Sequence, residues 1–206
     1  MITESLQITE GAAGLRALVS RAVGLDASAL ARFSQLNDDH LDVFVSTPFE
    51  VIASRRVKGT SSRDGAVVSA LDLSDALAVE REAVGTARDP NWMGALPPKV
   101  GFVERETLPV DVVRELANQG QDLARQFSGP LGPPKSLLDQ TVITIDDEVE
   151  IPMRMVFACT SLGLIPGFSA PVEIPRHLRV STVGRWIRLD APFGTVYKSA
   201  SLGLFV

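Results

Sequence analysis

Two helical stretches stand out in the pattern of apolar and polar positions along the chain. Residues 10–23 predict an amphipathic helix, capped by Thr9 and ended by Gly24, because apolar side chains recur at three- and four-residue spacing. A longer helix is predicted after Pro109, since proline suits the first turn of a helix. Its apolar stripe consists of Val110, Val113, Leu116, Ala117, Leu123, Ala124 and Phe127.

Alternation with period two dominates residues 29–57 and the segment from Leu178 to the C-terminus. The first stretch predicts three strands in a meander, with turns at 37–39 and at Pro48-Phe49. The second predicts a β-hairpin. We expect shorter helices at 74–83, 137–140 and 152–163, and shorter strands at 67–70, 100–108 and 141–145.

The order of these elements is not a regular alternation of strand and helix. It therefore predicts an α+β fold, built as an antiparallel β-meander with packed helices and a C-terminal β-hairpin. A length of 206 residues suits a single α+β domain over residues 1–206. A subdivision, if there is one, falls at the proline-rich connector 89–99.

Two stretches far apart in the chain share a Pro-Phe turn: "DVFVSTPFEVIAS" from Asp42 and "WIRLDAPFGTVYK" from Trp186. A four-residue turn with proline at its second position fixes the cross-strand register of each hairpin. The predicted pairs are Val45–Ile52 and Asp42–Arg55 in the first hairpin, and Leu189–Val196 and Arg188–Tyr197 in the second.

The second hairpin brings Trp186, Arg188 and Tyr197 onto one face and places Phe193 at its tip. One interpretation is a surface that stacks on and hydrogen-bonds a ligand or a protein partner. The other is that the aromatic rings lie under a neighbouring helix and the stem of Arg188 covers them. These four residues are the candidate partner-binding site.

The formal net charge of −5 gives no global attraction to nucleic acid. Locally, however, the segment from Arg176 to the C-terminus contains four arginines and Lys198 but only one acidic residue. A helix followed by a basic hairpin is typical of a winged helix. The candidate nucleic-acid residues are Arg179, Arg185, Arg188 and Lys198.

The sequence offers little for catalysis or metal binding. It contains two histidines and one cysteine, it has no Gly-x-Ser-x-Gly motif, and its Gly- and Pro-rich stretch at 129–135 lacks a phosphate-binding ending. Glu104 and Glu106 share one face of a predicted strand, which is also the pattern of a half-exposed strand. We therefore predict no catalytic residue, no metal site and no cofactor.

Several features indicate a cytoplasmic protein. A single cysteine, Cys159, excludes an internal disulfide, and the N-terminal residues have no secretory pattern. The longest uncharged run, 155–172, contains two prolines and three hydroxyl side chains, which argues against a membrane span. The oligomeric state is left open.

The segments "TPFEVIASRRVKG", "WMGALPP" and "GRWIRLDAPFGTVY" resemble a family of small uncharacterised cytosolic proteins from actinomycetes. The resemblance extends over most of the chain. It implies a bacterial cytosolic setting, and it transfers no activity, cofactor or site residue.

The first functional hypothesis is a non-enzymatic cytosolic binding or regulatory module. It would contact a protein partner or a small ligand through the face of the C-terminal hairpin. The second is a nucleic-acid-binding regulator with a winged-helix-like C-terminal part. The third is an enzyme of a type that no motif reveals.

Overall fold

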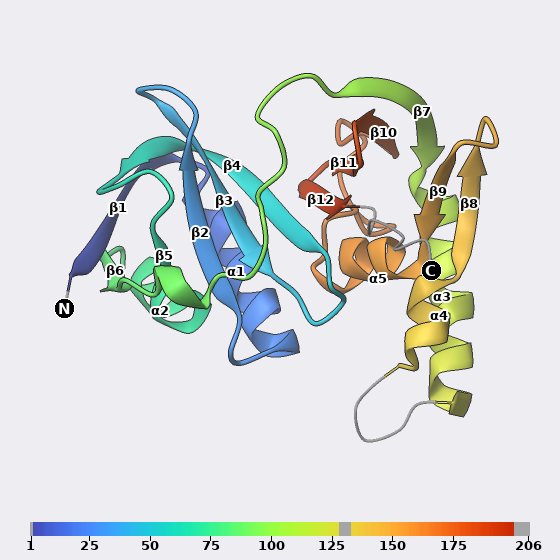
Figure 1. The fold of residues 1–206 in the computed structure, drawn as a ribbon, viewed down its shortest axis with the longest axis horizontal. Coiled ribbons are helices and arrows are strands. Elements are labelled where there is room, and N and C mark those ends of the chain that lie inside the picture. The colour runs from blue at the N-terminus through green and yellow to red at the C-terminus, as the bar shows by residue number, and fades with distance from the viewer. Residues whose placement is uncertain (1, 128–132, 200–206) are drawn as a thin grey trace, which may run out of the picture. The chain divides into compact units, whose positions relative to one another are not determined.

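The computed structural model describes residues 2–127 and 133–199, and it confirms the α+β fold with antiparallel strands (Figure 1). Its contacts divide the chain into two compact units. The first comprises Met1–Pro48 and Ile52–Lys99, and the second comprises Phe49–Val51 and Val100–Val206. The change of unit after Lys99 falls at the end of the predicted connector.

The first unit is an antiparallel sheet with two helices. Its central strands lie in the order β5-β2-β3-β4, and β1 pairs with both β4 and β6. The elements are β1 Thr3–Glu10, α1 Ala12–Leu25, β2 Leu30–Gln35, β3 His40–Ser46, β4 Ile52–Ser61, β5 Val67–Ser69, α2 Ala70–Ala78, β6 Ala83–Thr86 and the 3-10 turn η1 Asp89–Asn91.

The core of the first unit forms where the apolar stripe of α1 meets α2 and the sheet. The apolar stripe of α1 consists of Leu15, Leu18, Val19 and Ala22, which are at most 1% exposed. Alternate residues of β3, including Leu41, Val43 and Val45, are fully buried. The apolar residues that recur with period 3.6 in α1 and with period 2 in β3 thus pack into one core.

Both helices of the first unit begin at other residues than predicted. Thr9 does not cap α1, because Thr9 and Glu10 belong to β1, and Gly11 at φ 93° precedes the helix instead. The helix α2 begins at Ala70, where the Ser69 hydroxyl accepts a hydrogen bond from the Asp72 N–H. The Ser69 cap therefore sets the start of α2, and the pairing of β1 sets the start of α1.

The predicted register of the first Pro-Phe hairpin is wrong by one residue. Val45 lies opposite Ala53, and Asp42 lies opposite Arg56 rather than Arg55. The connection from 47 to 51 is one residue longer than a four-residue turn allows, with Glu50 at φ 56°. Because a slip of one residue exchanges the two faces of a strand, Arg56 makes the ion pair with Asp42, at 2.8 Å.

Arg55 lies on the opposite face of β4, against α1. A Cβ at Gly14 of α1 would come within 2.2 Å of the Arg55 guanidinium, so the end of this side chain lies directly over Gly14. Burial lowers the pKa of Arg55 below its usual value.

The second unit holds four antiparallel strands in the order β12-β11-β10-β7 and a two-stranded β8–β9 hairpin. Its elements are β7 Val103–Pro109, α3 Val110–Phe127, α4 Lys135–Asp139, β8 Thr141–Ile145, β9 Val149–Pro152, α5 Met153–Ser161, β10 His177–Val183, β11 Trp186–Ala191 and β12 Gly194–Ser199.

The helix α5 is the centre of the second unit, and its residues from Met153 to Cys159 are all buried. It packs against α3 at Gly120, where a Cβ would lie 2.7 Å from Met153 and 2.8 Å from Phe157. The predicted stripe of α3 is buried along most of the helix but not at its end. Leu123 is 40% exposed and Phe127 is 67% exposed.

Candidate functional site

The second Pro-Phe hairpin has the predicted register. Leu189 pairs with Val196, Arg188 pairs with Tyr197, and the strands reverse direction between Ala191 and Gly194. Trp186, Arg188 and Tyr197 therefore share one face of the sheet, as expected. Leu189 and Val196 point to the other face, where they are buried.

The predicted face is organised around Phe102, a residue that the sequence did not single out. The Tyr197 ring meets the Phe102 ring edge-on, with centroids 6.1 Å apart, and the Arg188 guanidinium lies 4.3 Å from the Phe102 centroid. Arg188 also forms an ion pair with Asp190, Nε to Oδ2, at 2.9 Å. Tyr197 is 7% exposed, whereas Trp186 and Arg188 keep partial exposure.

The four candidate nucleic-acid residues do not share a face. Arg179 is exposed and lies opposite Asp190, on the same face as Arg188. Arg185 is exposed in the turn between β10 and β11. Lys198 pairs with Ile187, and these residues belong to the opposite face, that of Leu189 and Val196.

Lys198 lies in the electrostatic field of a buried cluster. Burial lowers its pKa below the usual value, repulsion by Arg154 adds to this, and attraction by Asp139 and Glu50 opposes it. Lys198 is therefore a half-buried cation rather than a freely solvated one.

Arg154, on α5, is the centre of that cluster. Its guanidinium donates to the Phe49 carbonyl and to Glu50 Oε2, both at 2.7 Å, and to the Asp139 carboxylate. The Arg154 side chain is 3% exposed, whereas the Glu50 and Asp139 side chains are 65% and 49% exposed. Two solvated acids thus neutralise one desolvated cation, and Phe49 packs against Phe157 beside them.

Two further arginines, Arg114 and Arg176, hold the loop 164–176, which joins α5 to β10. Arg114 donates to the Pro166 carbonyl and to Asp111 Oδ1. Arg176 donates to the carbonyls of Gly167 and Ala170, at 2.8 and 2.9 Å. We call this segment the arginine-held loop.

The arginine-held loop presents apolar side chains to solvent. Phe168 is 80% exposed and Val172 is 93% exposed, and the Arg114 guanidinium lies 4.2 Å from the centre of the Phe168 ring. The hairpin tip adjoins the start of the loop, because the Phe193 N–H donates to the Leu164 carbonyl at 3.0 Å. A fixed backbone that carries exposed apolar side chains is suited to contact another molecule.

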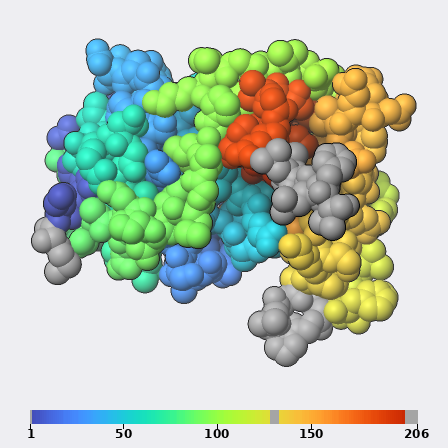
Figure 2. All heavy atoms as spheres, in the orientation of Figure 1, coloured from blue at the N-terminus to red at the C-terminus, as the bar shows by residue number. Residues whose placement is uncertain are grey.

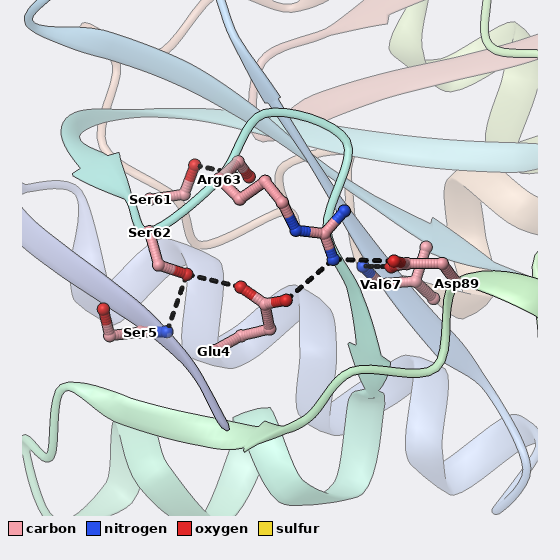
Figure 3. A network of polar contacts seen from close by, with 7 residues as sticks. All are labelled: Glu4, Ser5, Ser61, Ser62, Arg63, Val67 and Asp89. Carbon is pink, nitrogen blue, oxygen red and sulfur yellow. Dashed lines mark hydrogen bonds and ion pairs between the residues drawn. The ribbon is translucent and has the colours of Figure 1, made fainter. Parts of the chain in front are cut away.

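The first unit contains a buried carboxylate, Glu4, at 1% exposure (Figure 3). Its two oxygens accept hydrogen bonds from the Ser62 hydroxyl at 2.5 Å and from Arg63 at 2.7 Å. Arg63 also donates to Asp89, whose other oxygen accepts the Val67 N–H. Because both oxygens of Glu4 and of Asp89 are engaged within the protein, this network fastens β1 to the loop after β4.

The other groups weighed for chemistry are either buried or solvent-exposed side chains. Cys159 is fully buried, and burial raises the pKa of its thiol to about 12, which makes it a poor nucleophile. Glu104, Glu106 and His177 are exposed. Within residues 2–127 and 133–199, no group of three His, Cys, Asp or Glu side chains is arranged to hold a metal ion.

The burial of α5 bears on the prediction of a winged-helix-like C-terminal part. A helix that reads a DNA groove needs an exposed polar face, and α5, which precedes the basic hairpin, is buried from Met153 to Cys159. The winged-helix expectation therefore does not fit this fold.

Among the described residues, no helix is both long enough and apolar enough to cross a lipid bilayer.

Comparison with known sequences assigns the chain to a family. Residues 97–203 match the model of a domain of unknown function, DUF8185, and the chain belongs to this family. Residues 1–94 match a second domain of unknown function, DUF8010. These matches confirm the resemblance to an uncharacterised family. No curated protein sequence matches the chain.

Comparison with solved structures identifies the fold as that of bacterial DNA polymerase sliding clamps. The clamp of Pseudomonas aeruginosa, determined with a ligand, has a TM-score of 0.58 at 11% identity, and that of Bacillus subtilis has 0.57 at 9%. Both matches cover 100% of this chain and 66% of the clamp chain. The clamp of Bartonella birtlesii, bound to griselimycin, has 0.55 at 12%, over 98% and 66%. This chain thus spans 66% of the length of those clamps.

Proposed function

We propose that this chain is a non-enzymatic module that binds a protein partner through its second unit. The observation that carries the proposal is the exposure of Phe168 and Val172 on the arginine-held loop. Leaving a phenylalanine side chain in water forgoes about 2 kcal/mol of burial energy. A backbone that three arginine hydrogen bonds keep in this exposed form therefore favours an external contact.

The hairpin face remains part of this proposal. Phe193 adjoins the arginine-held loop, and Trp186 and Arg188 extend a partly exposed surface along β11, with Tyr197 and Phe102 supporting Arg188. Likeness to clamps that were solved with a ligand or with griselimycin supports a binding role for such a fold.

The experiment is site-specific photo-crosslinking with a benzophenone amino acid at position 168 in bacterial lysate treated with nuclease. We expect one discrete crosslinked protein at position 168 and none at position 118, an exposed site on α3. Phe168→Asp should weaken capture of that protein by about 2 kcal/mol, roughly thirtyfold, as for a hot-spot residue. Val79→Asp, an equally apolar exposed position in the first unit, should leave capture unchanged.

Two results would contradict the proposal. One is equal crosslinking at positions 168 and 118, because the contact would then be non-specific. The other is a melting temperature that falls for Phe168→Asp but not for Val79→Asp, because a structural role would then account for any loss of capture.

Nucleic-acid binding is the second candidate, because the similar structures are DNA polymerase clamps. The net charge of −5 and the separation of Lys198 from Arg179 and Arg188 weigh against it. It predicts binding to duplex DNA that weakens steeply with salt and that needs Arg179 and Arg185. Absence of any mobility shift at low salt would exclude it.

A further inference from the structure

The first unit contains a cavity beside β1, with a volume of about 550 Å³. It is lined by residues 6–9 of β1, by Ala12 at the start of α1, by Leu77 near the end of α2 and by residues 80–82 before β6. In Figure 2 part of β1, drawn in dark blue, lies at the surface of the first unit. Successive side chains of a strand point to opposite faces, so four consecutive lining residues mean that the backbone edge of β1 faces the cavity.

That edge of β1 has a partner along only the first half of the strand. On this side β1 pairs with β6 from Thr3 to Ser5, and the Leu6 N–H donates to the Glu82 carbonyl at 2.9 Å. Beyond Leu6, the part of the chain that the structure describes places no further strand there, because β1 pairs only with β4 and β6. The cavity therefore occupies the position in which the line of β6 would continue.

The backbone of Ile8 points into this open position. Ile8 lies opposite Gly59 of β4. An antiparallel strand alternates the direction of its N–H and C=O groups, so Ile8 points the same way as Leu6, away from β4. This agrees with the N–H of Gly59, which donates to the Asp39 carbonyl rather than to Ile8. The N–H and the C=O of Ile8 are thus available to a further strand.

The side chains at the cavity differ between the two faces of β1. On the core side, Leu6 is 4% exposed and Ile8 and Leu77 are half-buried, which gives an apolar floor. On the other side, Gln7 is exposed, and its Nε2 donates to both oxygens of Glu82 at 3.2 Å. An added strand would therefore place one row of alternate side chains against apolar groups and the other row beside a carboxylate.

The rim of the cavity is negatively charged overall. Glu80 and Glu82 are exposed there, against one cation, Arg81. The Arg81 Nε donates to the Ala83 carbonyl at 3.1 Å, so part of its guanidinium is already engaged with the backbone. A basic side chain on the outer row of an added strand would complement this rim, whereas an acidic one would meet two carboxylates.

We propose that residues 6–9 of β1 bind a short extended segment of a protein partner by strand addition. The segment pairs with Ile8 through backbone hydrogen bonds, which supply the affinity. Its apolar side chains contact Leu77, and its basic side chains lie beside Glu80 and Glu82, which supplies the specificity. The site lies within the first unit, so it is separate from the binding surface proposed for the second unit.

The probe is the capped peptide Lys-Val-Lys-Val-Lys, labelled with fluorescein and added to the full chain. Fluorescence anisotropy measures its binding, and amide hydrogen exchange followed by NMR reports on the backbone. The Ile8 amide should exchange about tenfold more slowly when about nine-tenths of the chain is bound, because only the free fraction exchanges. The Gln7 amide, which points to β4, should keep its exchange rate and serves as the internal control.

N-methylation of the peptide separates strand pairing from simple charge attraction. Methyl groups on the two valine nitrogens block one edge of the extended peptide, and a methyl group on the central lysine nitrogen blocks the other edge. Only one edge of the bound segment faces β1. We therefore expect the affinities of the two methylated peptides to differ by about tenfold, although their charges are identical.

Variants of the chain test the rim. The double variant Glu80→Gln with Glu82→Gln should weaken peptide binding about fivefold at low salt, which is the loss of two exposed charge pairs. Glu10→Gln is the matched control, because Glu10 lies on β1 outside the cavity lining and forms an ion pair with Lys58. It should change the affinity by less than about twofold. Both variants should keep the melting temperature, since all three glutamates are exposed.

Four outcomes would overturn the proposal. The first is absence of any anisotropy change at millimolar protein. Unchanged Ile8 exchange in the presence of bound peptide would place the peptide elsewhere on the surface. Equal affinity of the two methylated peptides would mean that charge attraction alone accounts for binding. Ile8 exchange that slows as the concentration of the chain rises, without peptide, would assign this edge to a second copy of the chain.

Discussion

The two Pro-Phe turns have nearly the same sequence pattern but different structures. The connection from 47 to 51 buries Phe49 to 8% exposure, against Phe157. The second turn is tight, between paired Ala191 and Gly194, and leaves Phe193 only partly buried. The short pattern specifies a hairpin in both places, and the surroundings of each phenylalanine decide the length of the turn and therefore the register.

The extra residue of the first turn has a physical reason. Burying the Phe49 ring and bonding its carbonyl to Arg154 outweighs the cost of placing Glu50 at φ 56°, which is about 1–2 kcal/mol. In the second turn, the Phe193 N–H at the tip donates a backbone hydrogen bond to the Leu164 carbonyl, which a tight turn supplies without strain. Tertiary contacts of Phe49 thus set the register of the first hairpin, and turn geometry sets the register of the second.

The largest expected difference between the turns comes from removing the two rings. Phe49→Ala should lower the free energy of unfolding by about 3 kcal/mol, because it empties a buried site. Phe193→Ala should cost about 1 kcal/mol, since its ring is partly exposed. Urea unfolding of both variants measures the difference, and equal losses would show that the turns are packed alike.

Next in size is the anchor of the first turn. Arg154→Met should lower the free energy of unfolding by about 2 kcal/mol, less than for a fully buried ion pair because Glu50 and Asp139 are half-exposed. Arg125→Met removes an ion pair whose two side chains are 76% and 68% exposed, and it should change stability by less than about 0.5 kcal/mol. Equal losses in the free energy of unfolding would show that the Arg154 cluster stabilises the fold no more than a surface ion pair does.

A smaller effect tests the register itself. A double-mutant cycle between Asp42 and Arg56 should give a coupling energy of about 0.5 kcal/mol, since Arg56 is 60% exposed. The cycle between Asp42 and Arg55 should give a coupling near zero, because these side chains lie on opposite faces. Coupling of Asp42 to Arg55 instead of Arg56 would contradict this register and support the four-residue turn.

The smallest effect concerns Lys198 on the second hairpin. Its pKa is lowered in the folded chain, so the unfolded chain binds more protons and stability should rise with pH towards 10.5. Lys198→Met should therefore stabilise the protein at neutral pH, and this advantage should shrink as the pH approaches 10.5. Thermal unfolding from pH 7 to 10.5 measures it, and a difference independent of pH would contradict the lowered pKa.

Sequence periodicity was sufficient for the fold class, the α1 and α3 stripes and the second hairpin, because these depend on neighbours in the chain. It missed β1 and β6, which are short or largely polar and gain their structure by pairing with each other and with β4. It also missed Phe102 and the role of Arg154, whose hydrogen-bond acceptor Phe49 is 105 positions away. The partner-binding role of Trp186, Arg188, Phe193 and Tyr197 stays a prediction.

The position of β1 in the sheet has a consequence for how the chain is made. Thr3 pairs with Thr86 and Leu6 pairs with Ser61, so β1 lies between two strands that are synthesised after it. Until those partners emerge, β1 has unpaired backbone groups on both sides, and such long-range pairing is slow. Folding of the first unit should therefore be completed late in its synthesis, and slowing translation before codon 86 should prolong the interval in which the nascent chain needs a chaperone.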